Sequence, residues 1–182
     1  YYADIKKRMT DTGRDPNTCK ILSGMQPIIG ETEAEALEKQ AYHNELVPEE
    51  GGMAILSAHL NFDMSNLTPD TEMASREEPE LQRMKPRYTK PAGGSFTARE
   101  IATRHGQSVS LPQFVGTASS VVDQMEAWIE EVGGDGFMLS PIYCPGAIEE
   151  FVDHVVPELQ RRGMYREGYT GKTQRDHLLQ HN

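Results

Sequence analysis

The chain has 182 residues, of which 37% are hydrophobic and 25% charged, a composition typical of a globular domain with an apolar core. Its formal net charge of −10 argues against nucleic acids and anionic membranes as partners, because both attract a surplus of Lys and Arg. No apolar run approaches the ~20 residues of a membrane span, and the spacing of Cys19 and Cys144 fits neither a metal site nor a redox motif, so we expect a cytoplasmic protein without a metal.

The first quarter of the chain predicts a helix, a strand and a second helix. Residues 1–12 carry the amphipathic pattern of a helix from the first residue onward, so we expect the chain to begin inside an element. The run CKILSGMQPIIG (19–30) is short, apolar and bounded by turn residues, which is typical of a strand buried on both faces. Thr32 and Glu35 then form a capping box, which starts a helix that we expect to reach about Leu46.

Residues 48–95 follow no lasting pattern and are rich in Pro, Gly, Asn, Asp and Met. An irregular stretch of this length is uncommon in a compact domain, and is more often a lid, a binding loop or a disordered insert. We therefore predict a lid-like insertion at about 48–95 within a single domain that covers residues 1–182.

Regular patterns return after the insertion. A second capping box, Thr97 with Glu100, predicts a short helix that ends near Gly106. A strand is expected over 108–116, and a clean apolar stripe at helical spacing predicts a helix over 117–132. The free N–H groups at the start of that helix are a possible anion site.

The last part of the chain predicts one more strand and one more helix. FMLSP (137–141) is typical of a short buried strand, and Pro157 is expected to kink or split the helix over 146–162. Five apolar residues of that helix are expected to face inward: Ile148, Phe151, Val152, Val155 and Leu159.

The order of these elements is a helix followed by three strand-to-helix units with one insert. Such alternation predicts a parallel sheet with right-handed crossovers. Three strands are few for a sheet covered on both faces, whereas a complete eightfold barrel needs about 250 residues. We therefore predict an α/β fold, the C-terminal part of a TIM (β/α)8 barrel with about three βα units plus the insertion.

Seven segments in this order carry a family resemblance. They are residues 13–16, 29–36, 63–65, 96–100, 115–139, 151–163 and 169–173. Together they resemble the luciferase-like flavin-dependent monooxygenases, in the branch that contains nitrilotriacetate monooxygenase component A, and they cover nearly the whole chain.

The resemblance implies an enzyme that oxidises a small organic substrate with O2 and reduced FMN, the flavin being supplied by a separate NAD(P)H-dependent flavin reductase. It also implies that the main phosphate-binding loop precedes the segment that begins at Tyr1, so flavin binding by this chain alone is in question. We expect a homo-oligomer. Two alternatives stay open: a non-catalytic half-barrel that pairs through its open strand edges, and a deazaflavin-dependent oxidoreductase of the same barrel superfamily.

The barrel fold places candidate site residues at the carboxyl ends of the strands. Ser140 and Tyr143 follow the last strand and are cofactor-binding candidates. In the insertion, His59 and Asp63 are four residues apart, a spacing that places both side chains on one face if that segment is helical.

We take His59 and Asp63 as catalytic candidates, with His59 a donor to the substrate or to an oxygen atom carried by the flavin. The alternatives are a packed or solvated His59 and a capping Asp63. Arg87 and Tyr88 are substrate-binding candidates, with a surface position as the alternative.

Overall fold

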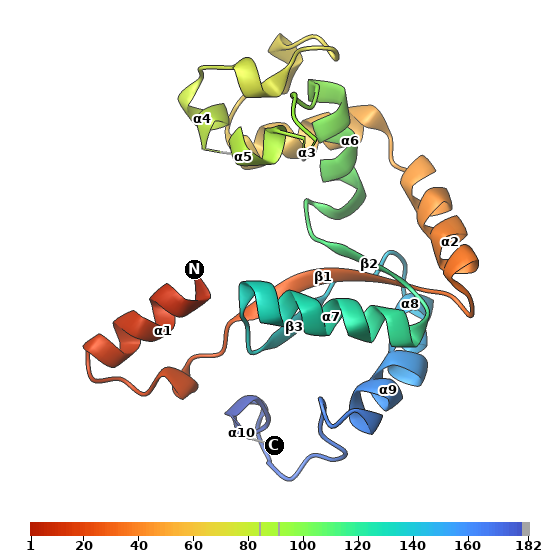
Figure 1. The fold of residues 1–182 in the computed structure, drawn as a ribbon. Coiled ribbons are helices and arrows are strands. Elements are labelled where there is room, and N and C mark those ends of the chain that lie inside the picture. Colours follow the sequence, from red (N-terminus) through yellow and green to blue (C-terminus); the bar gives the residue numbers. More distant parts are fainter. Residues whose placement is uncertain (84, 91, 180–182) are drawn as a thin grey trace. The chain divides into compact units, whose positions relative to one another are not determined.

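The computed structural model describes residues 1–83, 85–90 and 92–179, without the side chains of residues 86 and 87. The chain forms two compact units (Figure 1). Unit 1 consists of Tyr1–Gln40 and Pro112–Asn182, and unit 2 consists of Ala41–Leu111. Among the described residues, no helix combines the length and the apolar character needed to cross a bilayer.

Unit 1 is built on a three-stranded parallel sheet with the strand order β2-β1-β3. The strands are β1 (Leu22–Ile29), β2 (Gln113–Gly116) and β3 (Gly136–Leu139). The last four residues of β1 pair with β2, and its first four pair with β3. Each outer strand therefore has one edge without a strand partner in the described part of the chain.

The α/β class and the parallel sheet agree with the sequence prediction, but the strand order is not the sequential one. Strands that follow one another in the chain are neighbours in an eightfold barrel, which would place β2 in the middle. Here β1 is central, because it is twice as long as either partner and offers each of them a different half.

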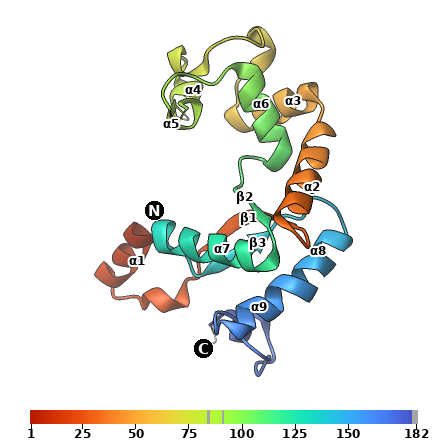
Figure 2. The same ribbon diagram turned by 45° about the vertical axis from the view of Figure 1, so that its right-hand side comes forward.

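The core of unit 1 lies between the sheet and two helical segments. α7 (Ala118–Val132) is followed after β3 by α8 (Gly146–Glu150), the π-helical turn η4 (Phe151–Val155) and α9 (Val156–Arg161). Figure 2 shows α7 along the sheet, and α9 contacts α7. The buried core residues are Met25, Ile29, Phe114, Val121, Val122, Met125, Phe151, Val155 and Leu159.

The last long helix is irregular before Pro157, but its backbone stays helical from α8 into α9, so it is not split. Proline has no N–H to donate, and a π-helical turn precedes it at Phe151–Val155. Only part of the predicted inward face is buried: Ile148 is 42% and Val152 is 52% exposed, so the inward prediction was wrong for these two. The chain then continues to a short helix, α10 (Gln174–Leu179).

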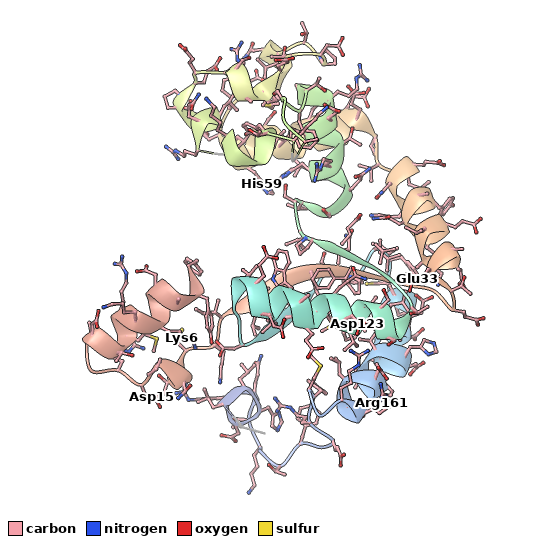
Figure 3. All side chains as sticks on the ribbon, viewed as in Figure 1. Lys6, Asp15, Glu33, His59, Asp123 and Arg161 are labelled. Carbon is pink, nitrogen blue, oxygen red and sulfur yellow. The ribbon has the colours of Figure 1, made fainter. Side chains whose placement is uncertain are left out.

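Asp135, directly before β3, fixes the first helix to unit 1. α1 (Tyr2–Asp11) contributes Lys6, whose Nζ lies 2.9 Å from Asp135 Oδ2, and Tyr2, whose hydroxyl donates to Oδ1 at 3.2 Å. Lys6 also donates to the carbonyl oxygen of Cys19, beside the turn η1 (Pro16–Thr18) (Figure 3). Burial raises the pKa of Asp135, but the N–H of Ile21 and the ammonium of Lys6 outweigh it and lower the pKa overall.

Unit 2 is helical. α2 (Glu33–Glu45) leads into it, and it contains α3 (Glu49–Leu60) and α6 (Ala98–Ser108). Between them lie the short turns and helices η2 (Met64–Asn66), η3 (Met73–Ser75), α4 (Pro79–Gln82) and α5 (Lys85–Tyr88). Its buried core residues are Leu56, Met64, Met73, Leu81, Tyr88, Ala98, Ile101 and Ala102.

The prediction of an irregular stretch was wrong for α3, which forms in spite of two adjacent glycines. A Cβ on Gly52 would lie 2.2 Å from the carbonyl oxygen of Ala102 in α6. The glycine therefore lets the two helix backbones approach closely, and their packing offsets its low helix propensity. Unit 2 contains residues 48–95, and the lid role of that stretch stays a prediction.

The capping box at the start of α6 is confirmed. Thr97 Oγ1 accepts from the N–H of Glu100, and the Glu100 carboxylate accepts from the N–H of Thr97 at 2.8 Å. The helix runs to Ser108, past the expected end, and the next residue has a positive φ of 54°. The strand expected over 108–116 is therefore confined to Gln113–Gly116.

Gly52→Ala is expected to lower the free energy of unfolding of unit 2 by about 1–3 kcal/mol, as overpacking does in other cores. The contacted oxygen belongs to the backbone of α6, which cannot move without disturbing the helix. Gly51→Ala is the matched control, because its Cβ would meet only the Pro48 ring, at 3.2 Å. Urea unfolding followed by circular dichroism measures both variants, and equal effects would contradict the close approach.

Unit 1 is expected to lose stability in acid as the Asp135 carboxylate becomes protonated. Its lowered pKa adds stability above the unfolded value of about 3.9, and this contribution is lost as the pH falls through the lower folded pKa. Between about pH 5 and about pH 2 the wild type should lose more stability than Asp135→Asn, which cannot ionise. Fluorescence of Trp128, the single tryptophan, reports the unfolding, and parallel pH curves would contradict the assignment.

Candidate functional site

A cleft of about 620 Å³ opens in unit 1 where β1 and β2 end. Ile29 and Gly30 from the end of β1, and Thr117 from the start of α7, form its floor. Charged side chains of α2 and of the α8–α9 segment line its walls. The carboxyl edge of a parallel sheet is the usual place for the active site in (β/α) proteins.

Gly30 sets the sharp entry into α2. A Cβ there would lie 2.5 Å from the backbone nitrogen of Ala36 and 2.8 Å from the carbonyl oxygen of Thr32. Only glycine therefore lets the helix start directly at the strand end. Thr32 Oγ1 accepts from the N–H of Glu35, as in the predicted capping box. The Glu35 carboxylate accepts from the N–H of Glu31 instead of that of Thr32, so the return bond is shifted by one residue.

Lys39 is the central cation of the cleft. Its Nζ donates to the carbonyl oxygen of Ile29 at 2.8 Å and to Glu150 Oε1 at 3.0 Å, and it lies 3.4 Å from Glu35. Burial lowers the pKa of Lys39, but Glu150 and then Glu35 outweigh this and raise the pKa above its ordinary value. The ammonium therefore ties the carboxyl end of β1 to α2 and α8.

Tyr143 joins the same network. Its hydroxyl donates to Glu150 Oε1 at 2.8 Å, and its ring lies against Gly146, where a Cβ would be 2.6 Å away. Burial, the hydrogen bond to Glu150 and the charge of Glu150 raise the pKa of Tyr143. The predicted candidate therefore contacts a residue of the cleft wall without lining the cleft itself, and its cofactor-binding role stays a prediction.

Ser140 lies half-buried directly after β3. Its backbone N–H donates to the carbonyl oxygen of Met25 at 2.8 Å. Because β3 ends opposite Met25, Ser140 lies level with the middle of β1 rather than with its end at Ile29. Its cofactor-binding role stays a prediction.

The start of α7 is occupied by a carboxylate of the chain itself. Glu33 Oε1 accepts from the backbone N–H and from the hydroxyl of Thr117, each at 3.1 Å (Figure 3). Thr117 Oγ1 in turn accepts from the N–H of Ser120 and caps α7. Glu33 therefore lies beside the position that the sequence suggested for an external anion, while Ala118 and Ser119 of the first turn line the cleft.

The cleft as a whole is acidic. Four carboxylates line it, those of Glu31, Glu35, Glu150 and Glu158, against the two cations Lys39 and Arg161, which leaves a formal charge of −2. Hydrogen bonds from Arg161 and then Arg162 lower the pKa of Glu158 to about 2, so this carboxylate is ionised at neutral pH. The lining fits a neutral or cationic polar group and does not fit a phosphate.

The two catalytic candidates of unit 2 do not share a helical face. α3 ends at Leu60 and Asn61 has a positive φ of 52°, so Asp63 lies beyond the helix that carries His59. Asp63 caps η2, accepting from the N–H and the hydroxyl of Ser65 at 3.0 and 2.7 Å, and these bonds lower its pKa. The capping alternative is confirmed.

His59 is exposed near the end of α3, and its Nδ1 lies 2.8 Å from Nε2 of the buried His105 in α6. Tyr88 is 2% exposed in the core of unit 2, so the surface alternative was wrong for this residue. The side chain of Arg87 lies outside the described residues. The catalytic role of His59 and the substrate-binding roles of Arg87 and Tyr88 stay predictions.

The sequence did not predict three of the site residues, Lys39, Glu150 and His105. The spacing of Glu35 and Lys39, i and i+4 on one helix, was the one available signal. Glu150 is 111 residues from Lys39, and His105 is 46 residues from His59, so these pairs are created by the fold.

Comparison with known proteins extends these observations. The chain is 36% identical over 185 residues to dibenzothiophene-sulfone monooxygenase of Rhodococcus erythropolis, covering 97% of this chain and 40% of that protein. It is 33% identical over 184 residues to nitrilotriacetate monooxygenase component A of Aminobacter aminovorans, covering 98% of this chain and 40% of that protein. No protein-family model matches the chain.

Solved structures show the same relationship. The chain superimposes with a TM-score of 0.84 on DmoA of Hyphomicrobium sulfonivorans, at 26% identity over 98% of this chain and 38% of DmoA. It also matches a riboflavin lyase solved with modified FMN and riboflavin, with a TM-score of 0.75 and 25% identity over 98% of this chain and 39% of the lyase.

The parallel sheet, the crossover helices and the cleft at the strand ends define a partial (β/α) barrel. More particularly, the chain is a homologue of the luciferase-like monooxygenases, as its sequence motifs predicted. It spans about 40% of the length of these two curated relatives.

Glu150→Gln is expected to lower the pKa of Tyr143 toward the ordinary tyrosine value, because a neutral acceptor no longer opposes formation of the phenolate. A pH titration of the ¹³Cζ resonance of Tyr143, assigned with Tyr143→Phe, measures the shift. Glu31→Gln is the control, since Glu31 lines the cleft without contributing to this pKa. An unchanged Tyr143 pKa in Glu150→Gln would contradict the network.

Proposed function

We propose that the chain supplies the C-terminal part of the barrel of an FMN-dependent monooxygenase. In this proposal the whole enzyme takes reduced flavin from a separate NAD(P)H-dependent reductase and uses O2 to oxidise a small organic substrate. The observation that carries the proposal is similarity over 97–98% of the chain to two proteins named as monooxygenases. The FMN-bound riboflavin lyase supports a flavin as the cofactor.

The described cleft does not fit the phosphate of FMN. Its four carboxylates outnumber its two cations, and a further carboxylate, that of Glu33, already accepts from Thr117 at the start of α7. We therefore assign the phosphate to residues of the whole protein outside this cleft. Reduced flavin, when bound, supplies the electrons for oxygen chemistry. The residues described here shape and charge the carboxyl edge of the sheet.

His59 is the proposed catalytic residue. In the described part of the chain, its Nδ1 bonds to His105 while its Nε2 has no hydrogen-bond partner, and its side chain is exposed. An outward-facing Nε2 can donate a proton to, or accept one from, a bound substrate. Asp63 accepts two hydrogen bonds from Ser65. We therefore propose that Asp63 stabilises the turn after α3.

The charge of the cleft favours a neutral substrate. A formal charge of −2 repels a polycarboxylate such as nitrilotriacetate and leaves a neutral sulfone without such a penalty. We therefore propose a neutral organic molecule of the sulfone or sulfide type as the substrate class.

Oxygen uptake tests the proposed function. The whole protein, with NADH, FMN, a flavin reductase and catalase, is expected to take up more O2 per NADH with added dibenzothiophene sulfone than with nitrilotriacetate, because catalase returns half of the O2 that free reduced flavin converts to H2O2. Absence of substrate-dependent uptake with any neutral sulfone or sulfide would contradict the monooxygenase assignment. Faster turnover of nitrilotriacetate would contradict only the charge argument. Reduction of a deazaflavin without O2 would instead favour the dehydrogenase alternative.

His59→Ala is expected to lower kcat/KM of the whole enzyme by about 10²–10⁴-fold, the usual contribution of a proton-transfer group. Asp63→Asn is the matched control. Asparagine caps as well as aspartate, so this variant should stay within a few-fold of the wild type. A His59→Ala enzyme as active as Asp63→Asn would rule out a catalytic His59.

A further inference from the structure

Three side chains of unit 2 form a continuous hydrogen-bonded row. Nδ1 of His59 lies 2.8 Å from Nε2 of His105, and Nδ1 of His105 lies 3.0 Å from Oγ of Ser110. The two rings meet edge to face, with centroids 5.0 Å apart and planes at 82°. His105 is 6% exposed, so the row leads from a buried ring to an exposed one.

The backbone that carries Ser110 has an unusual conformation. Val109 and Ser110, consecutive non-glycine residues, have φ values of 54° and 62°. L-residues rarely adopt this left-handed region, and a β-branched valine does so least readily. The turn ends α6 and brings the serine hydroxyl back to the histidine five residues earlier. Strain of this kind concentrates at functional sites.

The row links the protons of the two imidazoles. A bond between two ring nitrogens needs one proton, because a neutral imidazole donates from one nitrogen and accepts at the other. If His105 Nε2 carries that proton, His105 Nδ1 accepts from the Ser110 hydroxyl and His59 carries its own proton on Nε2. If His59 Nδ1 carries it, both rings adopt the Nδ1–H form and His59 Nε2 is bare.

We propose that His105 and Ser110 are positioning residues that hold His59 as the Nε2–H tautomer with its N–H directed outward. This arrangement keeps both rings in the tautomer that neutral histidine prefers in water, and Ser110 donates at the buried end of the row. Donation of the Nε2 proton to a substrate rests on the proposed function. In this tautomer, Nε2 of His59 donates a proton in the resting protein and does not act as a base.

Tautomers are measured by ¹⁵N NMR of the histidine rings in the whole protein, with His59 and His43 assigned by substitution, at a pH where the spectra show both rings neutral. The wild type is expected to show His59 with a protonated Nε2 and an unprotonated Nδ1. His43 is an internal reference, since its Nε2 lies 3.1 Å from the carbonyl oxygen of Gln107 and must donate there. A His59 with protonated Nδ1, or with averaged nitrogen shifts, would overturn the proposal.

Variants test whether the row is the cause. His105→Leu removes the donor, and Ser110→Ala removes the group that orients it, so each should give averaged His59 shifts. His105→Gln can still donate an amide N–H to His59 Nδ1 and should restore the wild-type pattern. His43 should stay unchanged in all three variants, which shows that unit 2 is folded. Wild-type His59 shifts in His105→Leu, with His43 unchanged, would overturn the proposal.

The outcome is independent of the enzyme assay. The spectra need neither flavin nor substrate, so an inactive whole protein would contradict the proposed function and leave this result standing. Conversely, an active enzyme whose His59 shows averaged shifts would retain the proposed function and exclude the positioning role of His105 and Ser110.

Discussion

Pairing of β1 along both of its edges is the constraint on which the rest of unit 1 depends. Because β2 takes the last four residues of β1 and β3 takes the first four, one strand aligns both crossover segments. The same alignment brings the ends of β1 and β2 together, so that Gly30 can start α2 and Lys39 can bond to the last carbonyl of β1. The outer edges of β2 and β3 are left without strand partners in the described chain, and exposed edges of this kind are completed by further strands in stable proteins.

Local sequence signals predicted the elements better than their arrangement. α7 lies within the bounds that its apolar stripe predicts, and α6 starts at its capping box. Strand order depends instead on which halves of β1 meet which partner, and no pattern within either short strand encodes that choice. α3 was missed because glycine reads as a helix breaker, whereas the close approach of Gly52 to α6 is a tertiary effect. Only the location of the site, at the strand ends, was predictable, because its central ion pair, Lys39–Glu150, joins residues 111 positions apart.

The charged residues of the cleft indicate which kind of molecule it can bind. Lys39 and Arg161 are each paired with a carboxylate, and Glu33 accepts from Thr117 at the start of α7, so both cations are engaged while the cleft keeps a formal charge of −2. An edge of this kind can orient a neutral molecule, but it offers no free cation to a phosphate. These charges agree with the proposed function, in which the cleft faces a neutral molecule and residues outside it bind the cofactor phosphate.

A crystal structure of the whole protein with FMN tests the central claim most directly. The account predicts that the outer edges of β2 and β3 are paired with further strands of a closed barrel, and that the flavin ring lies at the edge marked by Ile29, Thr117 and Ser140. It also predicts that no phosphate contact is made by the cleft around Lys39. A three-stranded sheet with both edges still open, or a flavin at the opposite edge beside Asp135, would contradict it.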